Sequence, residues 1–487
     1  MQAPAPCVRT SSSARAVIAA SVVVLAFLRL AHIRVLWADE DFHIAASLNL
    51  LHGRVPYRDF IYDKPPLSAC FYLLIGGHAG WPLRLLDAAY VLLVCYLAYR
   101  LARFWWGEAE GQIAALLLAF FMAFYLPSAV VSFAPDALMM LPHLAAIYFA
   151  RKKQYLLAGL LAGIGFWINT KALFVLGTCA LWAFPAIWVN GRRLLSGFAA
   201  VLLAGCLALL SAGAWHDYID QVWLWGLRYA TQPPGTNPLH TGLVLTINWM
   251  GFHSALVLAA AFALSRMETG DRWKCAVWIV LSFLAVALGS RFSPRYFLQI
   301  LPPLVIVASR GITLAWRAYG RSAVAVLALL LLVPLARFGP RYFMLALDNL
   351  QHREPAWADV ALDVDNRRAA TRIRALSHPG DTLFVWGLRS SIYVYSRMIS
   401  DSRFWDSEPL TGVPGDRHLT AAAPIDIGPA AQYRTELSQS QPTFLVDGLG
   451  LLNPRLAPER YPELLSWLRK YKLIGRTGST LIYQRIP

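Results

Sequence analysis

The chain has 487 residues, of which 57% are hydrophobic and only 15% are charged, and its formal net charge is +16. Soluble globular proteins contain about a quarter charged residues. The composition therefore disfavours a water-soluble enzyme, a disordered protein and a disulfide scaffold, and predicts a polytopic α-helical membrane protein.

The first third of the chain begins a series of apolar runs, each of which predicts a membrane span of ~17–25 residues. The first run lacks a small-residue cleavage site and ends in His32 and Arg34, so we expect a retained signal-anchor. About eleven spans are expected, near residues 17–36, 82–104, 111–127, 134–150, 155–170, 172–190, 194–213, 242–264, 273–289, 296–315 and 321–338.

Basic residues fall on alternate loops, which predicts the orientation of the chain. They include Arg9 and Arg15 before the first span, Arg151-Lys152-Lys153 and Arg192-Arg193. The positive-inside bias makes that side cytoplasmic, and an odd number of spans then puts the tail outside. No basic face is concentrated on a soluble element, so the bilayer and not nucleic acid is the expected partner.

The outer loops are long, at residues 37–66 and 214–241, and the second has apolar residues at helical spacing that predict an amphipathic interfacial helix. We expect a membrane domain over 1–338 and an extracytoplasmic α/β domain over 339–487. Expected helices in the tail are 357–376, 429–439 and 462–471, and expected strands are 382–386, 443–446 and 480–483. The outer loops are long and the inner loops are short, so we expect the functional site on the outer side of the membrane.

Two charged motifs stand in the first outer loop. Asp39-Glu40-Asp41 directly follows the first span, and it is either a solvated acidic cap or a group of carboxylates used in a reaction. Asp63-Lys64 precedes Pro65-Pro66, where the chain re-enters the membrane. Lys64 is either a snorkelling lysine or a cation for a lipid phosphate, with Asp63 as its partner or as a metal ligand.

Further charges lie near later spans. Lys171 stands between apolar stretches, where an isolated charge costs about 2.5–3.5 kcal/mol. Lys171 either caps a helix, forms an ion pair with Asp136 or takes part in a functional site. Arg291 and Arg295 lie four residues apart on an outer loop, so they share a face if helical and call for an anionic partner. Arg228 is a weaker candidate for contact with an anionic partner. His43 is a weak candidate for a metal ligand, because an ordinary histidine at the membrane interface is more expected there than one of a pair of metal ligands.

The motifs together resemble a known family. An acidic pair follows the first span, Lys64-Pro65-Pro66-Leu67 ends the first outer loop, and Gly163–Lys171 and Arg291–Pro303 follow. This pattern is similar to the polyprenyl-phosphate-sugar-dependent glycosyltransferases of the GT-C membrane fold, which include protein O-mannosyltransferases and lipid A aminoarabinose transferases. The resemblance covers roughly residues 16–315.

The resemblance implies roles for matching positions. Asp39 corresponds to the catalytic acidic residue, with Glu40 as its competitor, and Lys64 and Lys171 to residues that contact the carrier phosphate. Tyr296 matches the tyrosine of the late motif, beside Arg291 and Arg295, and Asp136 a second acidic position. Phe42, Asp63 and Arg295 depart from the aminoarabinose pattern or related late motifs, which weakens aminoarabinose as the donor and leaves metal use open.

The family resemblance implies transfer of a sugar from a polyprenyl phosphate to an envelope acceptor at the outer face of the bacterial inner membrane, with inversion. Besides the polyprenyl-phosphate sugar, which is the donor substrate, the resemblance leaves a divalent metal open as a cofactor. Two alternatives are a lipid-linked sugar flippase, which predicts inverted repeats and midplane charges, and a non-catalytic lipid-binding subunit. No repeat is visible, and the charges cluster at the outer ends of spans, so we rank the flippase below the transferase.

Overall fold

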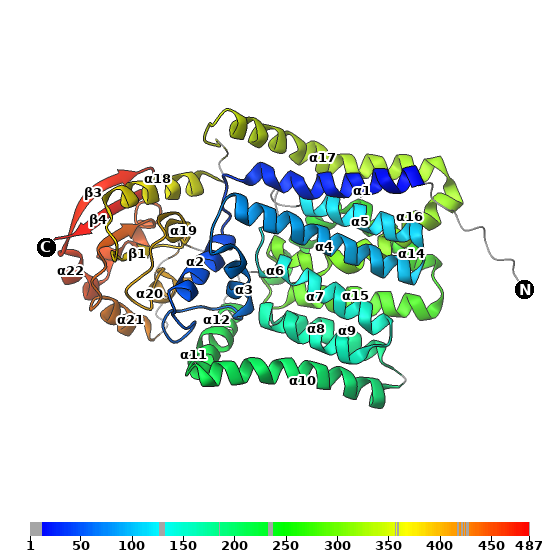
Figure 1. The fold of residues 1–487 in the computed structure, drawn as a ribbon, viewed down its shortest axis with the longest axis horizontal. Helices are drawn as coiled ribbons and strands as arrows, with labels where there is room; N and C mark the ends of the chain where they lie inside the picture. The colour runs from blue at the N-terminus through cyan, green and yellow to red at the C-terminus, as the bar shows by residue number, and fades with distance from the viewer. Residues whose placement is uncertain are drawn as a thin grey trace, which may run out of the picture. The chain divides into compact units, whose positions relative to one another are not determined.

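The structure is a computed structural model that describes residues 12–125, 132–184, 186–231, 237–355, 357, 360–415, 418–419, 422, 424 and 428–486. Arg9, which entered the orientation argument, lies outside the described residues. The chain divides into two compact units, drawn with their elements in Figure 1. The first contains residues 1–32, 84–206 and 235–347, and the second contains 33–83, 207–234 and 348–487.

The first unit is helical. In chain order its elements are α1 Ser12–Phe27, η1 Leu28–His32, α4 Trp81–Trp105, α5 Glu108–Ala123, α6 Pro135–Leu138, α7 Met140–Arg151, α8 Tyr155–Ile168, α9 Ala172–Trp182, α10 Ile187–Ser211, α13 Pro238–Phe252, α14 Ser254–Arg266, α15 Thr269–Ala287, η4 Pro294–Gln299, α16 Leu301–Tyr319 and α17 Arg321–Leu350. Helix α14 packs closely on α16, because a Cβ atom at Gly311 would lie 1.8 Å from the Ala259 carbonyl oxygen. Glycine therefore permits this approach of two backbones.

Every expected apolar run contains a helix, but the count of eleven spans is not confirmed. Among the described residues, four helices are long and apolar enough to cross a membrane by themselves, namely 12–32, 81–105, 187–211 and 321–350. The run 242–264, expected as one straight span, is instead bent by 89° between α13 and α14. At the break, His253 stacks on Trp249 with ring centroids 4.0 Å apart, and its Nδ1 hydrogen-bonds the Trp249 carbonyl.

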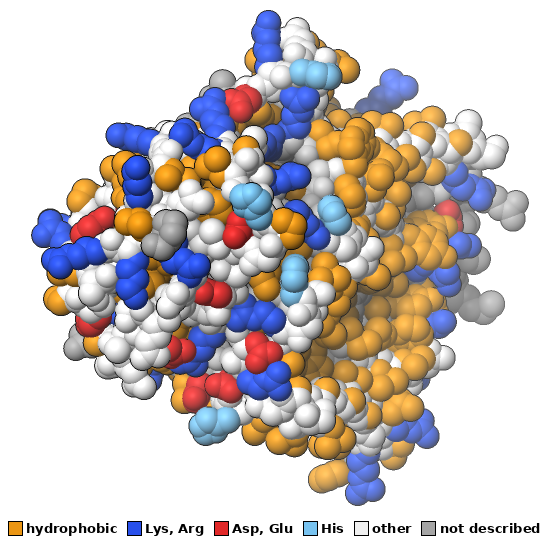
Figure 2. Space-filling model, turned by 60° about the vertical axis from the view of Figure 1, so that its left-hand side comes forward, with side chains coloured by type: hydrophobic (Ala, Val, Ile, Leu, Met, Phe, Trp, Pro, Cys, Tyr) orange, Lys and Arg blue, Asp and Glu red, His pale blue; other side chains and the backbone are white. Residues whose placement is uncertain are grey.

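Hydrophobic side chains cover much of the outer surface of this helical unit (Figure 2). Leu195, Leu203 and Leu329 are each more than half exposed. Such an apolar exterior is expected where lipid is the solvent and no water needs to be excluded from it.

Charges inside the first unit are paired. Arg29 and Asp87 are both fully buried, and their Nε and Oδ2 atoms lie 2.5 Å apart. Arg29 also donates a hydrogen bond of 2.7 Å to the Met122 carbonyl, and Arg84 lies 3.6 Å from the same Asp87 carboxylate. One carboxylate therefore balances two buried guanidinium groups.

Asp87→Ala should consequently destabilise the helical unit. Two buried cations would lose their counter-charge, and breaking such a buried pair typically costs ~3–5 kcal/mol. The expected result is a strongly lowered apparent melting temperature of the purified protein in detergent. Glu268, an exposed carboxylate of the same unit, offers a matched control, since Glu268→Ala should change the melting temperature little. An Asp87→Ala protein as stable as the wild type would contradict this account.

The second unit joins both long outer loops to the tail. Its elements are α2 Glu40–Leu51, α3 Leu67–Cys70, η2 Phe71–Ile75, α11 Trp215–Tyr218, η3 Ile219–Leu224, α12 Trp225–Thr231, α18 Ala361–Leu376, β1 Leu383–Trp386, α19 Ser391–Ser396, α20 Glu408–Thr411, α21 Ala430–Leu437, β2 Phe444–Asp447, η7 Pro454–Leu456, η8 Pro458–Arg460, α22 Pro462–Leu468, β3 Tyr471–Thr477 and β4 Thr480–Arg485. The segment expected to contain one interfacial amphipathic helix forms an uninterrupted helical run from Trp215 to Thr231, whose middle part η3 is a π-helix.

The tail contains a four-stranded sheet in the order β1-β2-β4-β3, with β1 and β2 parallel and the other pairs antiparallel. Its core includes the buried side chains of Phe384, Trp386 and Trp467. The three expected strands lie at β1, β2 and β4, but β3 was missed. The helix expected over 462–471 ends at Leu468, and Tyr471 already begins β3.

Hydrogen bonds hold the first outer loop to the rest of the second unit. Arg54 donates to the Ser400 and Ser402 carbonyls at 2.8 and 2.9 Å, and Trp405 Nε1 donates to the Ile61 carbonyl at 2.7 Å. Helix α17 runs to Leu350, past the expected domain boundary at 338/339. The division into 1–338 and 339–487 stays a prediction.

Candidate active site

The acidic motif of the first outer loop forms the start of α2. Asp39 is its N-cap and is half-buried, with a φ of 77° that non-glycine residues seldom adopt. Glu40 is fully buried, and its Oε2 accepts a hydrogen bond of 3.2 Å from the Trp37 amide. Asp41 is buried too, and its Oδ2 accepts 2.9 Å from the Ser391 amide. Three adjacent carboxylates therefore have three different environments.

Burial, aided by the nearby carboxylates of Asp363 and Glu40, raises the pKa of Asp41 to about 7. Two backbone amides oppose this shift by hydrogen-bonding its carboxylate. Asp41 thus connects the first outer loop to α19 of the tail, which is a structural role.

His43 belongs to a buried hydrogen-bonded chain. Its Nδ1 lies 2.6 Å from the Tyr62 hydroxyl, which lies 2.8 Å from the Ser68 hydroxyl. Burial, aided by the charge of Lys64, lowers the pKa of His43 well below its usual value, so the imidazole is neutral at pH 7. Within the described ranges, no three His, Cys, Asp or Glu side chains group as metal ligands. The divalent metal stays a prediction.

Asp63 and Lys64 form an ion pair with each other. Their side chains are 24% and 44% exposed, so both remain accessible from solvent. The Tyr57 hydroxyl donates 2.7 Å to the Lys64 carbonyl and fixes the backbone before Pro65. The backbone of Lys64 is therefore held in place, while its side chain stays partly exposed to solvent.

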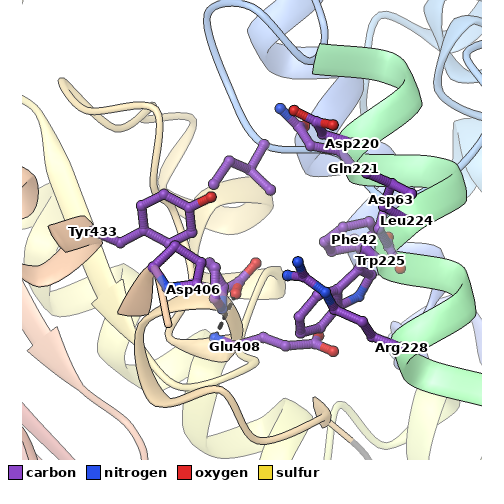
Figure 3. Close-up of a pocket in the computed structure, with 13 residues that line it drawn as sticks. Phe42, Asp63, Asp220, Gln221, Leu224, Trp225, Arg228, Asp406, Glu408 and Tyr433 are labelled. Atoms are coloured by element: carbon purple, nitrogen blue, oxygen red, sulfur yellow. Dashed lines mark hydrogen bonds between the residues drawn. The ribbon is translucent and has the colours of Figure 1, made fainter. Parts of the chain in front are cut away.

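A cavity of about 220 Å³ lies in the second unit, beside Asp63. Figure 3 shows Arg228 reaching into it from α12, opposite Asp406, Glu408 and Tyr433 of the tail. Its lining residues are Phe42, Ile61, Asp63, Asp220, Gln221, Leu224, Trp225, Arg228, Asp406, Glu408, Pro409, Pro429 and Tyr433. Asp39 and Glu40 do not line this cavity. Aromatic faces beside carboxylates and a guanidinium are suited to a polar ring such as a sugar.

Two carboxyl groups of this cavity have shifted acidities. Burial, aided by the charge of Asp63, raises the pKa of Asp406 to about 7 and that of Glu408 to about 8. The Glu408 amide donates 2.8 Å to Asp406 Oδ1, as the dashed line in Figure 3 marks. Near neutral pH both groups are therefore partly protonated in the folded protein.

These shifts predict a pH dependence of stability. Between about pH 4 and pH 8 the folded protein retains protons on Asp406 and Glu408 that the unfolded chain has released, so stability falls as pH rises through that window. The apparent melting temperature should fall between about pH 7 and pH 8.5, a range in which the buried His43 is neutral in the folded protein and mostly neutral in the unfolded chain. Asp406→Asn should reduce this difference, whereas Glu459→Gln, an exposed control in the same unit, should not. An identical pH profile for Asp406→Asn and wild type would contradict the assignment.

A second group of predicted residues lies in the first unit, around Asp136 and Lys171. The Lys171 Nζ lies 3.7 Å from Asp136 Oδ1 and 3.3 Å from the centroid of the Tyr296 ring. Asn169 and Gln299 each donate 3.0 Å to the same Asp136 oxygen. Lys171 is only 9% exposed, and its Nζ has no hydrogen-bond acceptor among the described residues. The expected pairing of Lys171 with Asp136 is present, but the ammonium retains its hydrogen-bonding capacity.

Arg291 and Arg295 do not lie on one helix, so the condition under which they were expected to share a face is not met. Arg291 is buried and precedes η4, which begins at Pro294, while Arg295 lies within η4. Arg295 extends over the Tyr296 ring at 5.7 Å. The break follows from the positive φ values of Ser290 and Phe292, which a continuous helix would not allow.

The predicted residues thus form two groups. Asp39, Glu40, His43, Asp63, Lys64 and Arg228 lie in the second unit, and Asp136, Lys171, Arg291, Arg295 and Tyr296 lie in the first. A common cavity for Lys64 and Lys171 stays a prediction, as do the roles of all these residues.

Sequence reasoning missed several polar residues of both groups. Asn169 and Gln299 stand inside the quoted motifs, and an amide within an apolar stretch is a signal that could have identified them. Asp406 and Glu408 carry no such signal, because their burial arises only when the tail folds.

Comparison with known proteins identifies the fold. Residues 63–215 match the family model described as dolichyl-phosphate-mannose-protein mannosyltransferase. No curated protein matches the sequence. The structure is similar to that of ArnT from Cupriavidus metallidurans bound to undecaprenyl phosphate, with a TM-score of 0.63 at 15% identity, over 98% of this chain and 99% of ArnT.

A second similar structure is the oligosaccharyltransferase AglB from Archaeoglobus fulgidus, in complex with an inhibitory peptide and a dolichol-phosphate. The TM-score is 0.50 at 13% identity, over 96% of this chain and 74% of AglB. The expected fold class, a polytopic helical protein with a small C-terminal sheet, is confirmed. The chain therefore has the GT-C fold of membrane glycosyltransferases, and the resemblance predicted from its motifs is confirmed.

Proposed function

We propose that the protein is a membrane glycosyltransferase that moves a sugar from a polyprenyl-phosphate donor to an envelope acceptor. The observation that carries this proposal is the family match over residues 63–215, because this segment contains Lys64, Asp136 and Lys171 together. The likeness to ArnT over nearly the whole of both chains supports it. The acceptor is a glycolipid, a polysaccharide or a protein of the envelope.

The carrier phosphate must be stabilised as it leaves the sugar. Lys171 is suited to this, because its buried ammonium lacks a hydrogen-bond acceptor among the described residues. Lys64, with a partly exposed side chain, is a second cation for the donor phosphate in this proposal, and Arg291, Arg295 and Tyr296 are further residues assigned to donor binding. Cation–phosphate hydrogen bonds are roughly twice as strong as neutral ones.

A general base must accept the proton of the acceptor. We assign Asp39, since Glu40 is fully buried against the Trp37 amide and Asp41 is held by the Ser391 amide. The φ of 77° at Asp39 is a strained conformation for a residue with a side chain, and such strain concentrates at functional sites. In a single displacement the acceptor oxygen bonds to the anomeric carbon, the bond to phosphate breaks, and the configuration inverts.

The proposed location is the bacterial inner membrane, with the N-terminus in the cytoplasm and the tail on the outer side. The cavity lined by Arg228, Asp406 and Glu408 is on that side in this orientation, and we propose that the tail shapes the acceptor site. Arg228 supplies a cation and Asp63 and Asp406 supply carboxyl groups to the same cavity.

The test is a transfer assay with the purified full-length protein. Labelled polyprenyl-phosphate sugars are incubated with the protein and a panel of lipid, polysaccharide and protein acceptors from bacterial envelopes. The proposal expects one donor to lose its sugar to an acceptor and Asp39→Asn to lose this activity. Absence of transfer from every donor in the panel, by protein that melts cooperatively, would contradict it.

A further inference from the structure

A second cavity, of about 400 Å³, lies within the second unit and is lined by basic side chains. Its lining residues are Ile33, Arg34, Val35, His78, Ala79, Gly80, Arg367, Arg374, Val394, Tyr395 and Arg397. Four of these eleven residues are arginines, and none is an aspartate or glutamate. The cavity is separate from the one lined by Asp406 and Glu408, since the two share no lining residue.

These arginines use part of their hydrogen-bonding capacity on neutral groups, since Arg367 donates to the Arg34 carbonyl and the Tyr395 hydroxyl. Arg367 pairs with Asp363 at 3.2 Å and lies over the Tyr395 ring, but its buried Nε has no hydrogen-bond partner among the described residues. Arg397 donates to the Gly76 and Gly77 carbonyls at 3.0 and 2.6 Å.

Arg34 and Arg374 make fewer hydrogen bonds than Arg367 and Arg397 in the described part of the chain. Arg34 makes one long contact of 3.3 Å, to the Arg353 carbonyl, and Arg374 is exposed. In the described part of the chain, no carboxylate forms an ion pair with Arg34, Arg374 or Arg397. Three guanidinium groups around one cavity without a counter-charge repel one another, so an anion between them is favoured.

Chain continuity puts this cavity at the membrane surface. Ile33 directly follows the candidate span Ser12–His32, and Gly80 directly precedes the candidate span Trp81–Trp105. Residues on both sides of the cavity therefore directly adjoin the ends of two candidate spans. A basic cavity at that depth lies at the level of lipid headgroups, and its apolar members Ile33, Val35 and Val394 suit the glycerol and acyl part of a lipid.

We propose that this cavity binds the phosphate headgroup of an anionic membrane lipid. The guanidinium fork matches two phosphate oxygens, which makes arginine the preferred residue for such recognition. In the proposed orientation Arg34 lies on the outer side, directly after a span, where the positive-inside bias disfavours it, so a local anion accounts for its presence. The site does not depend on the sugar-transfer reaction, because none of its residues belongs to the proposed donor or acceptor sites.

The test measures binding of phosphatidylglycerol to the purified full-length protein in neutral detergent. Phosphatidylcholine and inorganic phosphate serve as the comparison probes. We expect phosphatidylglycerol to bind, phosphatidylcholine to bind much more weakly, and inorganic phosphate to compete poorly because it lacks the lipid part. Arg34→Gln and Arg374→Gln should each weaken phosphatidylglycerol binding about fivefold. Arg374→Lys should retain most of it, since the charge remains.

Arg476→Gln is the matched control, because Arg476 is an exposed arginine of the same unit on β3, outside the cavity. It should leave lipid binding within about twofold of wild type, and all variants should keep the wild-type melting temperature. Equal affinity for phosphatidylcholine, unchanged binding by Arg34→Gln and Arg374→Gln together, or displacement of the lipid by equimolar inorganic phosphate would each overturn the proposal.

Discussion

Asp39→Asn should abolish sugar transfer while leaving the protein folded. Loss of a general base typically slows a reaction by about 10²–10⁴-fold, so turnover is expected to fall at least about 100-fold. The substitution is nearly isosteric, and asparagine tolerates the positive φ of this N-cap better than most residues. Expression, melting temperature and donor binding should therefore remain near those of wild type, which separates a chemical defect from a structural one.

Glu40→Gln is the neighbouring control for this experiment. Its amide oxygen can still accept the hydrogen bond from the Trp37 amide, so turnover should remain if Glu40 is structural. If Asp39→Asn is active and Glu40→Gln is inactive, the base is Glu40. If both variants transfer sugar normally, the acidic motif is only a helix cap and the proposed mechanism is wrong.

Lys171→Met should weaken donor binding strongly. A hydrogen bond from a charged group contributes ~1.5–3 kcal/mol, which corresponds to a loss of roughly 10- to 100-fold in affinity. Asp136 would lose a counter-charge 3.7 Å away, so the melting temperature should fall, although the carboxylate keeps its hydrogen bonds from Asn169 and Gln299. Binding is therefore measured well below the melting temperature of the variant. The measurement is binding of a polyprenyl-phosphate sugar to the purified protein, together with its melting temperature.

Lys152→Met provides a matched control in the same unit. Lys152 also lies over an aromatic ring, with its Nζ 5.1 Å from the centroid of Tyr148, but it is exposed. Removing its charge should leave donor binding unchanged. Equal donor affinity of Lys171→Met and wild type would contradict the proposed phosphate contact.

The helices were predictable because lipid selects long apolar runs, and each expected run contains a helix. The bend at His253 was not predictable, because the sequence around it stays apolar and the stacking of His253 on Trp249 is a tertiary contact. Strand β3 was missed for a different reason. It is an edge strand that carries Lys472 and Arg476, so it lacks the apolar character that revealed β1 and β2.

The candidate site was predictable where charged residues interrupt apolar sequence. Lys171 and Asp136 were found in this way, and the structure brings them within 3.7 Å of each other. Asp406 and Glu408 could not be found, because hydrophilic residues in a polar tail give no sign of burial. Their burial depends on the packing of the tail within the second unit, which no local pattern encodes.

The central claim is that the protein transfers the sugar and does not merely move or bind its carrier. The most direct measurement uses proteoliposomes loaded with a polyprenyl-phosphate sugar that is labelled separately in the sugar and in the isoprenoid, together with an envelope lipid acceptor. The account predicts that the sugar label appears on the acceptor while an equal amount of free polyprenyl phosphate forms, and that Asp39→Asn prevents both. If both labels cross the bilayer together and remain on one molecule, the protein is a flippase and the account is contradicted.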